Sequence, residues 1–260
     1  MSKPFLGVVH LPPLPSVASW RESFGAVLER ALRDAEALAK GGVDGVIVEN
    51  FGDAPFHKGT RDDPVPPDVV AGLAVVADRI RREFGLQVGI NCLRNDGIAA
   101  LGAAVVVGAT WVRINVLSGA YVTDQGIVEG EAARVRDYKN QLQSDVTILA
   151  DFLVKHAAPL ASVDPVAGAR DLAERSGASV LVLSGSRTGE AVDPELLADV
   201  RAAVQGFPVW IGSGLDLENA PNLWPRCDGA IVGTSLKTGG SVLEPVDPER
   251  VRAMRDALHG

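Results

Sequence analysis

Ionisable side chains recur in this sequence at the ends of short apolar runs. His10 follows the run at residues 5–9, Glu49 follows the run at residues 45–48, and Asp151 ends the run at residues 147–151, with Lys155 shortly after it. Carboxylates and imidazoles transfer protons when burial and neighbouring charges bring their pKa towards neutrality. We therefore expect His10, Glu49, Asp151 and Lys155 to be the catalytic residues.

Two of these residues have alternative roles. His10 is equally suited to being a hydrogen-bonded packing residue. Lys155 could act as a Schiff-base nucleophile if it is buried beside another cation, but a simple counter-ion to Asp151 is the better supported role. A further set of polar residues follows the same apolar runs, and we expect it to bind substrate: Asn50, Asn91, Arg94, Asn95, Asn115, His156 and Ser184. For Asn50 and Asn95, loop capping is the competing interpretation.

Two glycine turns late in the chain indicate an anion site. Gly212-Ser213-Gly214 and Gly233-Thr234 each follow a short apolar run. Backbone N–H groups and a hydroxyl in such turns can hold a phosphate group, and plain tight turns are the alternative. We expect Gly212, Ser213, Gly214, Gly233 and Thr234 to bind phosphate. A third polar glycine-rich turn at residues 184–189 contains Arg187, which could reach the same anion.

The sequence assigns no metal site and implies no organic cofactor. His10, Glu49, Asp151 and His156 are residue types that ligate divalent metals, but they form no compact His-x-x-x-His motif. A divalent metal is therefore left open rather than assigned.

Eight strand-like runs alternate with helical segments and position these residues. The expected strands are residues 5–9, 45–48, 87–91, 111–115, 147–151, 179–183, 208–211 and 229–232. Residues 26–40 carry apolar side chains on one helical face, and the Asp-Pro pairs at 164–165, 193–194 and 247–248 are typical helix starts. The alternation predicts an α/β fold, a (β/α)8 TIM barrel that forms one domain over residues 1–260.

Loop lengths indicate which end of the barrel is functional. Links from helix to strand are short and contain glycine, whereas links from strand to helix are long, as at residues 50–67, 118–130 and 234–247. In this fold the long loops surround the active site at the carboxyl ends of the strands. We expect the ligand to bind there.

Composition restricts the partners. The chain of 260 residues has a net charge of −8 and is 47% hydrophobic. Such an acidic chain repels nucleic acid and anionic lipid, and the apolar run at residues 98–109 is too short to span a bilayer. Cys92 and Cys227 form no disulfide framework, and the N-terminus does not resemble a signal peptide. We expect a cytoplasmic protein with a phosphorylated small-molecule ligand, no nucleic acid, no direct membrane insertion and, by default, a homo-oligomeric state.

Several longer motifs resemble those of the BtpA/SgcQ family. They include His10-Leu11-Pro12-Pro13-Leu14-Pro15, residues 48–56, 93–96, 113–120, 122–127, 154–157, 212–214 and 232–237, in order along the chain. The resemblance implies a barrel of the ribulose-phosphate-binding type. It also implies a link to photosystem I biogenesis, because the founding cyanobacterial member has that association, whereas an enteric member lies among sugar-uptake genes. The resemblance carries no catalytic residue assignment.

The residues favour one functional hypothesis. It is an enzyme of the lyase, isomerase or glycosyl-bond-cleaving type that acts on a phosphorylated sugar or nucleoside-like metabolite. The alternatives are a non-catalytic accessory factor for photosystem I biogenesis or stability, which rests on the resemblance alone, and a metabolite-binding barrel without catalysis.

Overall fold

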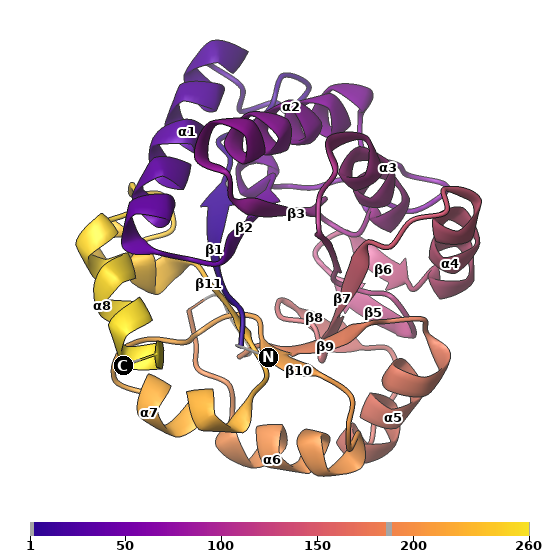
Figure 1. Ribbon diagram of the computed structural model, residues 1–260. Helices are drawn as coiled ribbons and strands as arrows, with labels where there is room; N and C mark the ends of the chain where they lie inside the picture. Colours follow the sequence, from indigo (N-terminus) through magenta and orange to yellow (C-terminus); the bar gives the residue numbers. More distant parts are fainter. Residues whose placement is uncertain (1–2, 186–188, 260) are drawn as a thin grey trace.

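Eight parallel strands close into a barrel, as the alternation predicts (Figure 1). The computed structural model describes residues 3–185 and 189–259. The barrel strands are β1 (Phe5–His10), β2 (Gly45–Glu49), β3 (Gln87–Asn91), β4 (Trp111–Ile114), β7 (Thr147–Phe152), β9 (Val180–Leu183), β10 (Val209–Ile211) and β11 (Ala230–Val232). β1 pairs with both β2 and β11, and this pairing closes the ring. The observed strand ends differ from the expected ones by one residue at most.

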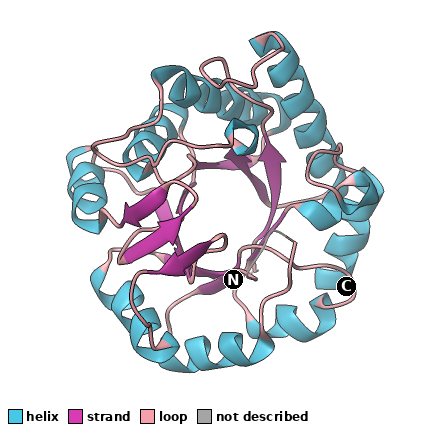
Figure 2. Cartoon of the chain, turned by 180° about the vertical axis from the view of Figure 1, so that it is seen from behind, coloured by secondary structure: helices cyan, strands magenta, loops and turns pink. Residues whose placement is uncertain are grey.

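Helices surround the barrel on its outer face (Figure 2). They are α1 (Phe24–Gly41), α2 (Pro67–Phe84), α3 (Gly97–Val107), α4 (Ala132–Gln141), α5 (Pro165–Arg175), α6 (Pro194–Ala203), α7 (Ala220–Leu223) and α8 (Pro248–His259). Short 3-10 helices also occur, at η1 (Phe51–Asp53), η2 (Trp224–Arg226), η3 (Thr234–Leu236) and η4 (Thr238–Gly240).

The three Asp-Pro pairs start helices as expected. The carboxylates of Asp164, Asp193 and Asp247 accept hydrogen bonds from backbone N–H groups of α5, α6 and α8. Each bond satisfies a helix-terminal N–H that has no partner within the helix.

Strand alternation divides the core into two regions. One set of strand side chains packs outwards against the helices, and the other set points into the barrel. The inner set is apolar at its base, with Leu6, Ile47, Trp111, Leu149 and Trp210 packed together. This apolar layer fills the lower part of the barrel. The inward-facing polar side chains therefore lie above it, at the carboxyl ends of the strands.

A small antiparallel sheet was not predicted from the sequence. It consists of β5 (Ala120–Thr123), β6 (Gly126–Glu129) and β8 (Ala157–Pro159), in the order β6-β5-β8. It joins the long segment after β4 to the segment after β7, and its inner face packs on Val116 and Val154. Each of its strands has at most one buried residue, so none of them forms the continuous apolar run by which the equally short barrel strands were predicted.

No helix in the described residues is long and apolar enough to cross a bilayer. The apolar run at residues 98–109 instead forms most of α3, which packs between α2 and α4.

Candidate functional site

A cavity of about 210 Å³ lies at the carboxyl ends of the strands. His10, Glu49 and Lys155, three of the four expected catalytic residues, line it. Both expected phosphate turns also line it, over Gly212–Gly214 and at Gly233 and Thr234. Residues from distant parts of the sequence thus meet in one concave site.

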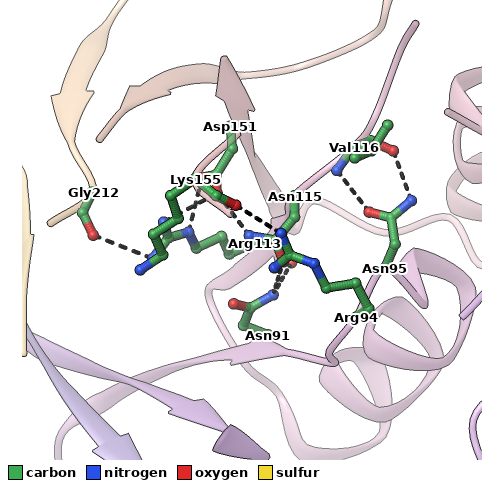
Figure 3. Close-up of polar contacts among 9 residues, drawn as sticks. All are labelled: Asn91, Arg94, Asn95, Arg113, Asn115, Val116, Asp151, Lys155 and Gly212. Carbon is green, nitrogen blue, oxygen red and sulfur yellow. Dashed lines mark hydrogen bonds and ion pairs between the residues drawn. The ribbon is translucent and has the colours of Figure 1, made fainter. Parts of the chain in front are cut away.

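Arg113 and Asp151 form a buried ion pair beside this cavity (Figure 3). Arg113 Nε lies 2.9 Å from Asp151 Oδ1, and Arg113 Nη2 lies 3.1 Å from Oδ2. Asn115 Nδ2 donates to Asp151 Oδ2 at 2.7 Å, and Asn91 Nδ2 donates to Asn115 Oδ1 at 3.2 Å. Burial disfavours the Arg113 charge, but the adjacent Asp151 outweighs it, so the pKa of Arg113 is raised. Asp151 is therefore held as an oriented carboxylate by three donor atoms.

Lys155 is the expected counter-ion to Asp151, but Arg113 makes the direct ion pair with that carboxylate. Lys155 and Asp151 interact through their charges, and no hydrogen bond or salt bridge between them is described. Arg113 was missed as a site residue, although the alternation of residues 111–115 contains the signal. Trp111, Arg113 and Asn115 share one face of the strand, and Trp111 packs inside the barrel, so Arg113 must point inwards as well.

His10 is enclosed by aromatic, glycine and cationic neighbours. Its ring meets Phe51 edge-on at 5.2 Å between centroids, and its Nδ1 is buried without a partner among the described residues. Burial, followed by the charges of Lys237, Lys155 and Arg113, lowers the pKa of His10 well below 6.5. The imidazole is therefore neutral at pH 7 and able to exchange a hydrogen bond or a proton with a ligand.

Glu49 and Lys155 reach the cavity from different elements: Glu49 is the last residue of β2, and Lys155 lies in the loop after β7. Within the described part of the chain, the Glu49 carboxylate accepts no hydrogen bond, although the residue is only 7% exposed. Lys155 lies between Leu153 and His156, both of which have positive φ, so the backbone turns sharply after β7. Burial, and then repulsion by Arg113, lowers the pKa of Lys155. A carboxylate and an ammonium group are thus available to a bound molecule.

Two serine hydroxyls near the first glycine turn are unpaired. The hydroxyl of Ser213, within this turn, and that of Ser184, directly after β9, are buried with no partner among the described residues. Gly214 has φ +76, and a Cβ there would lie 1.7 Å from the carbonyl oxygen of Glu190. At Gly233 a Cβ would lie 2.9 Å from His10 Cε1. The glycines therefore allow a close approach that side chains would block.

The start of η3 adds backbone donors to the same cavity. Gly233 precedes η3, and Thr234 and Ser235, the first residues of this 3-10 helix, line the cavity. The first N–H groups of a helix have no acceptor within it and are suited to an anion. Arg187 of the third expected turn lies outside the described residues.

Several expected substrate-binding residues are engaged with the backbone instead. Asn95 donates to the carbonyl of Val116 and accepts from its N–H, and Asn50 does the same with Leu93 while also donating to Asp53. These amides join neighbouring loops, which matches the capping alternative. Asn91 retains a buried Oδ1 without a described partner, so it could still accept from a ligand. His156 lies next to Lys155 in the segment before β8.

A second buried ion pair supports the end of the barrel after β11. Lys237, 1% exposed, lies 2.6 Å from Asp34 of α1, whose other oxygen accepts from the N–H of Val246. Sequence reasoning missed this pair, because its partners are 203 residues apart. It fixes the segment that follows Thr234 against α1.

The described residues contain no group of three or more His, Cys, Asp or Glu side chains placed to hold a metal ion. The groups that line the cavity include Glu49, His10, Lys155, Arg113 and the two glycine turns. These groups can bind an anion, polarise it and exchange protons with it.

The fold and this site define a (β/α)8 barrel with a polar cavity at its carboxyl-terminal mouth. The chain belongs to the BtpA family, whose model matches residues 1–260. It is 47% identical to the photosystem I biogenesis protein BtpA of Synechocystis sp., over 98% of this chain and 88% of that protein. It is 44% identical to an uncharacterised protein of Thermococcus kodakarensis, over 97% of this chain and 94% of the archaeal one.

Solved structures with the same fold include two enzymes. One is orotidine 5'-phosphate decarboxylase from Pyrococcus horikoshii, with a TM-score of 0.60, 15% identity, and coverage of 98% of this chain and 99% of the enzyme. The other is N-(5'-phosphoribosyl)anthranilate isomerase from Pyrococcus furiosus, with a TM-score of 0.58, 14% identity, and coverage of 98% of both chains. At these identities the likeness shows the fold alone.

Proposed function

We propose that the protein is an enzyme acting on a phosphorylated sugar or nucleoside-like metabolite bound at the mouth of the barrel. One observation carries the proposal: a single cavity joins the two glycine turns to His10, Glu49, Lys155 and Arg113. The solved barrels with this fold have names that specify phosphorylated compounds, which supports the proposal by analogy.

The phosphate group would lie on Ser213, Gly214, Thr234 and Ser235. The unpaired Ser213 hydroxyl would donate to a phosphate oxygen, and the N–H groups at the start of η3 would add further donors. Leaving these groups buried and unsatisfied is costly, so an anion with several acceptor oxygens fits this end of the cavity.

The reacting part of the substrate would lie between the phosphate turns and the Arg113–Asp151 pair. Glu49 suits the role of general base, because its carboxylate is unengaged among the described residues, and neutral His10 suits proton exchange. Lys155 and Arg113 would stabilise an enolate or other oxyanion. Asp151, whose oxygens are already engaged, would orient Arg113 and Asn115 rather than accept a proton.

Ligand binding tests the proposal first. A thermal-shift screen should include phosphorylated sugars, nucleotides and inorganic phosphate, each with and without divalent metal, and should compare wild type with Ser213→Ala and with a folded Gly233→Asp variant. A ligand present at 100 times its Kd should stabilise the wild type by about 2.7 kcal/mol. We expect a selective shift that both variants weaken. If no phosphorylated compound shifts the wild type, the phosphate proposal is wrong.

Turnover assays then test the catalytic roles. On the substrate class that the screen identifies, Glu49→Gln should lower kcat by at least about 100-fold with little effect on binding, because it removes only the base. A double variant with Glu49→Gln and Asp151→Asn that retains full turnover would contradict both assignments.

The alternative is an accessory role in photosystem I biogenesis. It is favoured by the 47% identity to the Synechocystis protein of that name. The name of the 44% identical Thermococcus kodakarensis relative specifies no photosystem role. Co-purification of the chain with photosystem I subunits, in the absence of any ligand-induced shift, would instead support the accessory role.

A further inference from the structure

Two cationic side chains beside the cavity have no carboxylate partner among the described residues. Arg94 is 5% exposed, and its Nη2 donates to the backbone carbonyl of Lys155 at 2.8 Å. The Lys155 side chain lines the cavity itself. Figure 3 shows both side chains next to the Arg113–Asp151 pair. The two cations are thus neighbours at the mouth of the barrel.

The charges at the mouth do not balance. The charges of Arg113 and Asp151 neutralise each other in their ion pair. Among the described residues, the other charged groups that interact within the barrel are the cations Arg94 and Lys155 and one carboxylate, Glu49, which leaves one positive charge in excess. Asp216 also lines the cavity, but its Oδ1 already accepts N–H groups from two following residues. Asp124 acts on Arg94 from an exposed hairpin, where solvent screens its charge. The chain as a whole carries −8, so this positive excess is local.

The two cations follow barrel strands other than those that carry the phosphate turns. The strand order around the barrel is β1-β11-β10-β9-β7-β4-β3-β2. The turns follow β10 and β11, whereas Arg94 follows β3 and Lys155 follows β7. In a closed ring of eight strands, β10 faces β3, so Arg94 follows the strand opposite the turn after β10. Lys155 follows β7, two strands from β10, and lines the same cavity as the turns. An anion held by the turns therefore leaves Arg94 for a different part of the same molecule, with Lys155 between the two.

We infer that the substrate carries a second acidic group, a carboxylate, which Arg94 binds opposite the turn after β10, with Lys155 beside it. The inference rests on the proposed function for the phosphate end and narrows the substrate to phosphorylated sugar acids and related compounds. A planar guanidinium matches a carboxylate, and burial strengthens the charged hydrogen bonds that form. A buried cation without a partner is unfavourable, so a ligand carboxylate relieves a cost that a neutral sugar would leave in place.

Matched ligands isolate the carboxylate. 6-Phosphogluconate and sorbitol 6-phosphate differ only in a carboxylate in place of a hydroxymethyl group, as do 3-phosphoglycerate and glycerol 3-phosphate. Isothermal titration of the full chain should show that the acid in at least one pair binds about tenfold tighter or more, equivalent to one charged hydrogen bond. In Arg94→Gln this ratio should fall towards one, while the phosphoalcohol keeps its affinity. In Lys155→Met the ratio should also fall towards one, and the ratio alone is compared, because Lys155 lines the same cavity as the phosphate turns. Arg33→Gln, an exposed change on α1, is the charge-matched control and should keep the ratio.

The outcomes separate this inference from the proposed function. Equal affinity for acid and alcohol in both pairs overturns the carboxylate subsite and leaves the phosphate proposal standing. A preference for the acid that survives in both variants overturns the assignment to Arg94 and Lys155. If no phosphorylated ligand binds, titration with gluconate tests the carboxylate subsite by itself. Gluconate binding that depends on Arg94 or Lys155 supports the subsite, and the absence of gluconate binding overturns it. Because Lys155 is only partly buried, Lys155→Met keeps the test usable if Arg94→Gln does not fold.

Discussion

The protonation state of His10 links the candidate site to the stability of the fold. Burial and the charges of Lys237, Lys155 and Arg113 lower its pKa well below 6.5 in the folded protein, whereas the unfolded chain titrates near 6.5. Below pH 6.5 the unfolded chain therefore binds a proton that the folded protein does not. The contribution of His10 to stability is complete above pH 6.5 and is lost as the pH falls towards the lowered value.

We predict that this loss reaches at most about 1.4 kcal/mol between about pH 7.5 and pH 5.5, and that His10→Gln removes it. Urea unfolding of both proteins at the two pH values measures the effect. Only the difference between wild type and variant is assigned to His10, because buried carboxyls titrate in both proteins. Parallel pH profiles would show that His10 protonates equally well in the folded and unfolded states.

The sequence predicts a residue's role only where its position at the end of a strand determines that its side chain points into the barrel mouth. His10 and Glu49 stand at strand ends, and the structure places both at the cavity. Arg113 lies within a strand-like run rather than at its end, so strand position alone does not mark it, although its alternation with Trp111 places it inside the barrel. The Lys237–Asp34 pair could not be found, since no local pattern reports a contact between α1 and the segment after β11.

At the scale of elements, the turn after β10 depends on a close approach between two loops. Gly214 and Gly206 both have positive φ, at +76 and +83, so an alanine at either position meets similar backbone strain. At Gly206 nothing lies within 4 Å of the added Cβ, whereas at Gly214 the Glu190 carbonyl oxygen lies 1.7 Å away. Comparing an alanine at Gly206 with one at Gly214 therefore distinguishes the effect of backbone strain from the effect of a steric clash.

We predict that Gly206→Ala costs about 1–2 kcal/mol of unfolding free energy and leaves ligand binding unchanged. Gly214→Ala should cost more and should also weaken phosphate binding at least about tenfold, because the turn must move. Chemical denaturation and titration with the phosphorylated ligand measure the two effects. Equal losses of stability with unchanged affinity in both variants would place Gly214 outside the binding turn.

Elements were predicted where a local pattern, a buried apolar run or a helix cap, marks them. The eight barrel strands and the helix starts at Asp164, Asp193 and Asp247 follow from apolar runs and from capping chemistry that operate locally. The sheet of β5, β6 and β8 was missed because its strands form no apolar run and its third strand comes from a distant segment. Its stability depends on tertiary contacts that no window of sequence contains.

At the scale of the whole molecule, the described fold combines a closed barrel with a small sheet that has open edges. Every barrel strand pairs on both sides, so its amides have no free edge from which to open. The small sheet has only three strands, and Val122 and Ile127 on its outer face are 45% and 49% exposed. Fewer buried contacts predict opening at a lower free energy than that of the barrel.

We predict two classes of amides in native-state hydrogen exchange. Buried barrel amides such as Val46 and Val48 should exchange only through global unfolding, and amides of β5 and β6 should exchange at least about 100-fold faster through local opening. Low concentrations of denaturant provide the control. Global exchange should accelerate steeply, since it exposes the whole core, whereas exchange in the small sheet should respond weakly. If both classes show the same rate and the same denaturant dependence, the small sheet and the barrel unfold as one cooperative unit, and the loops that carry Lys155 are as rigid as the strands beneath them.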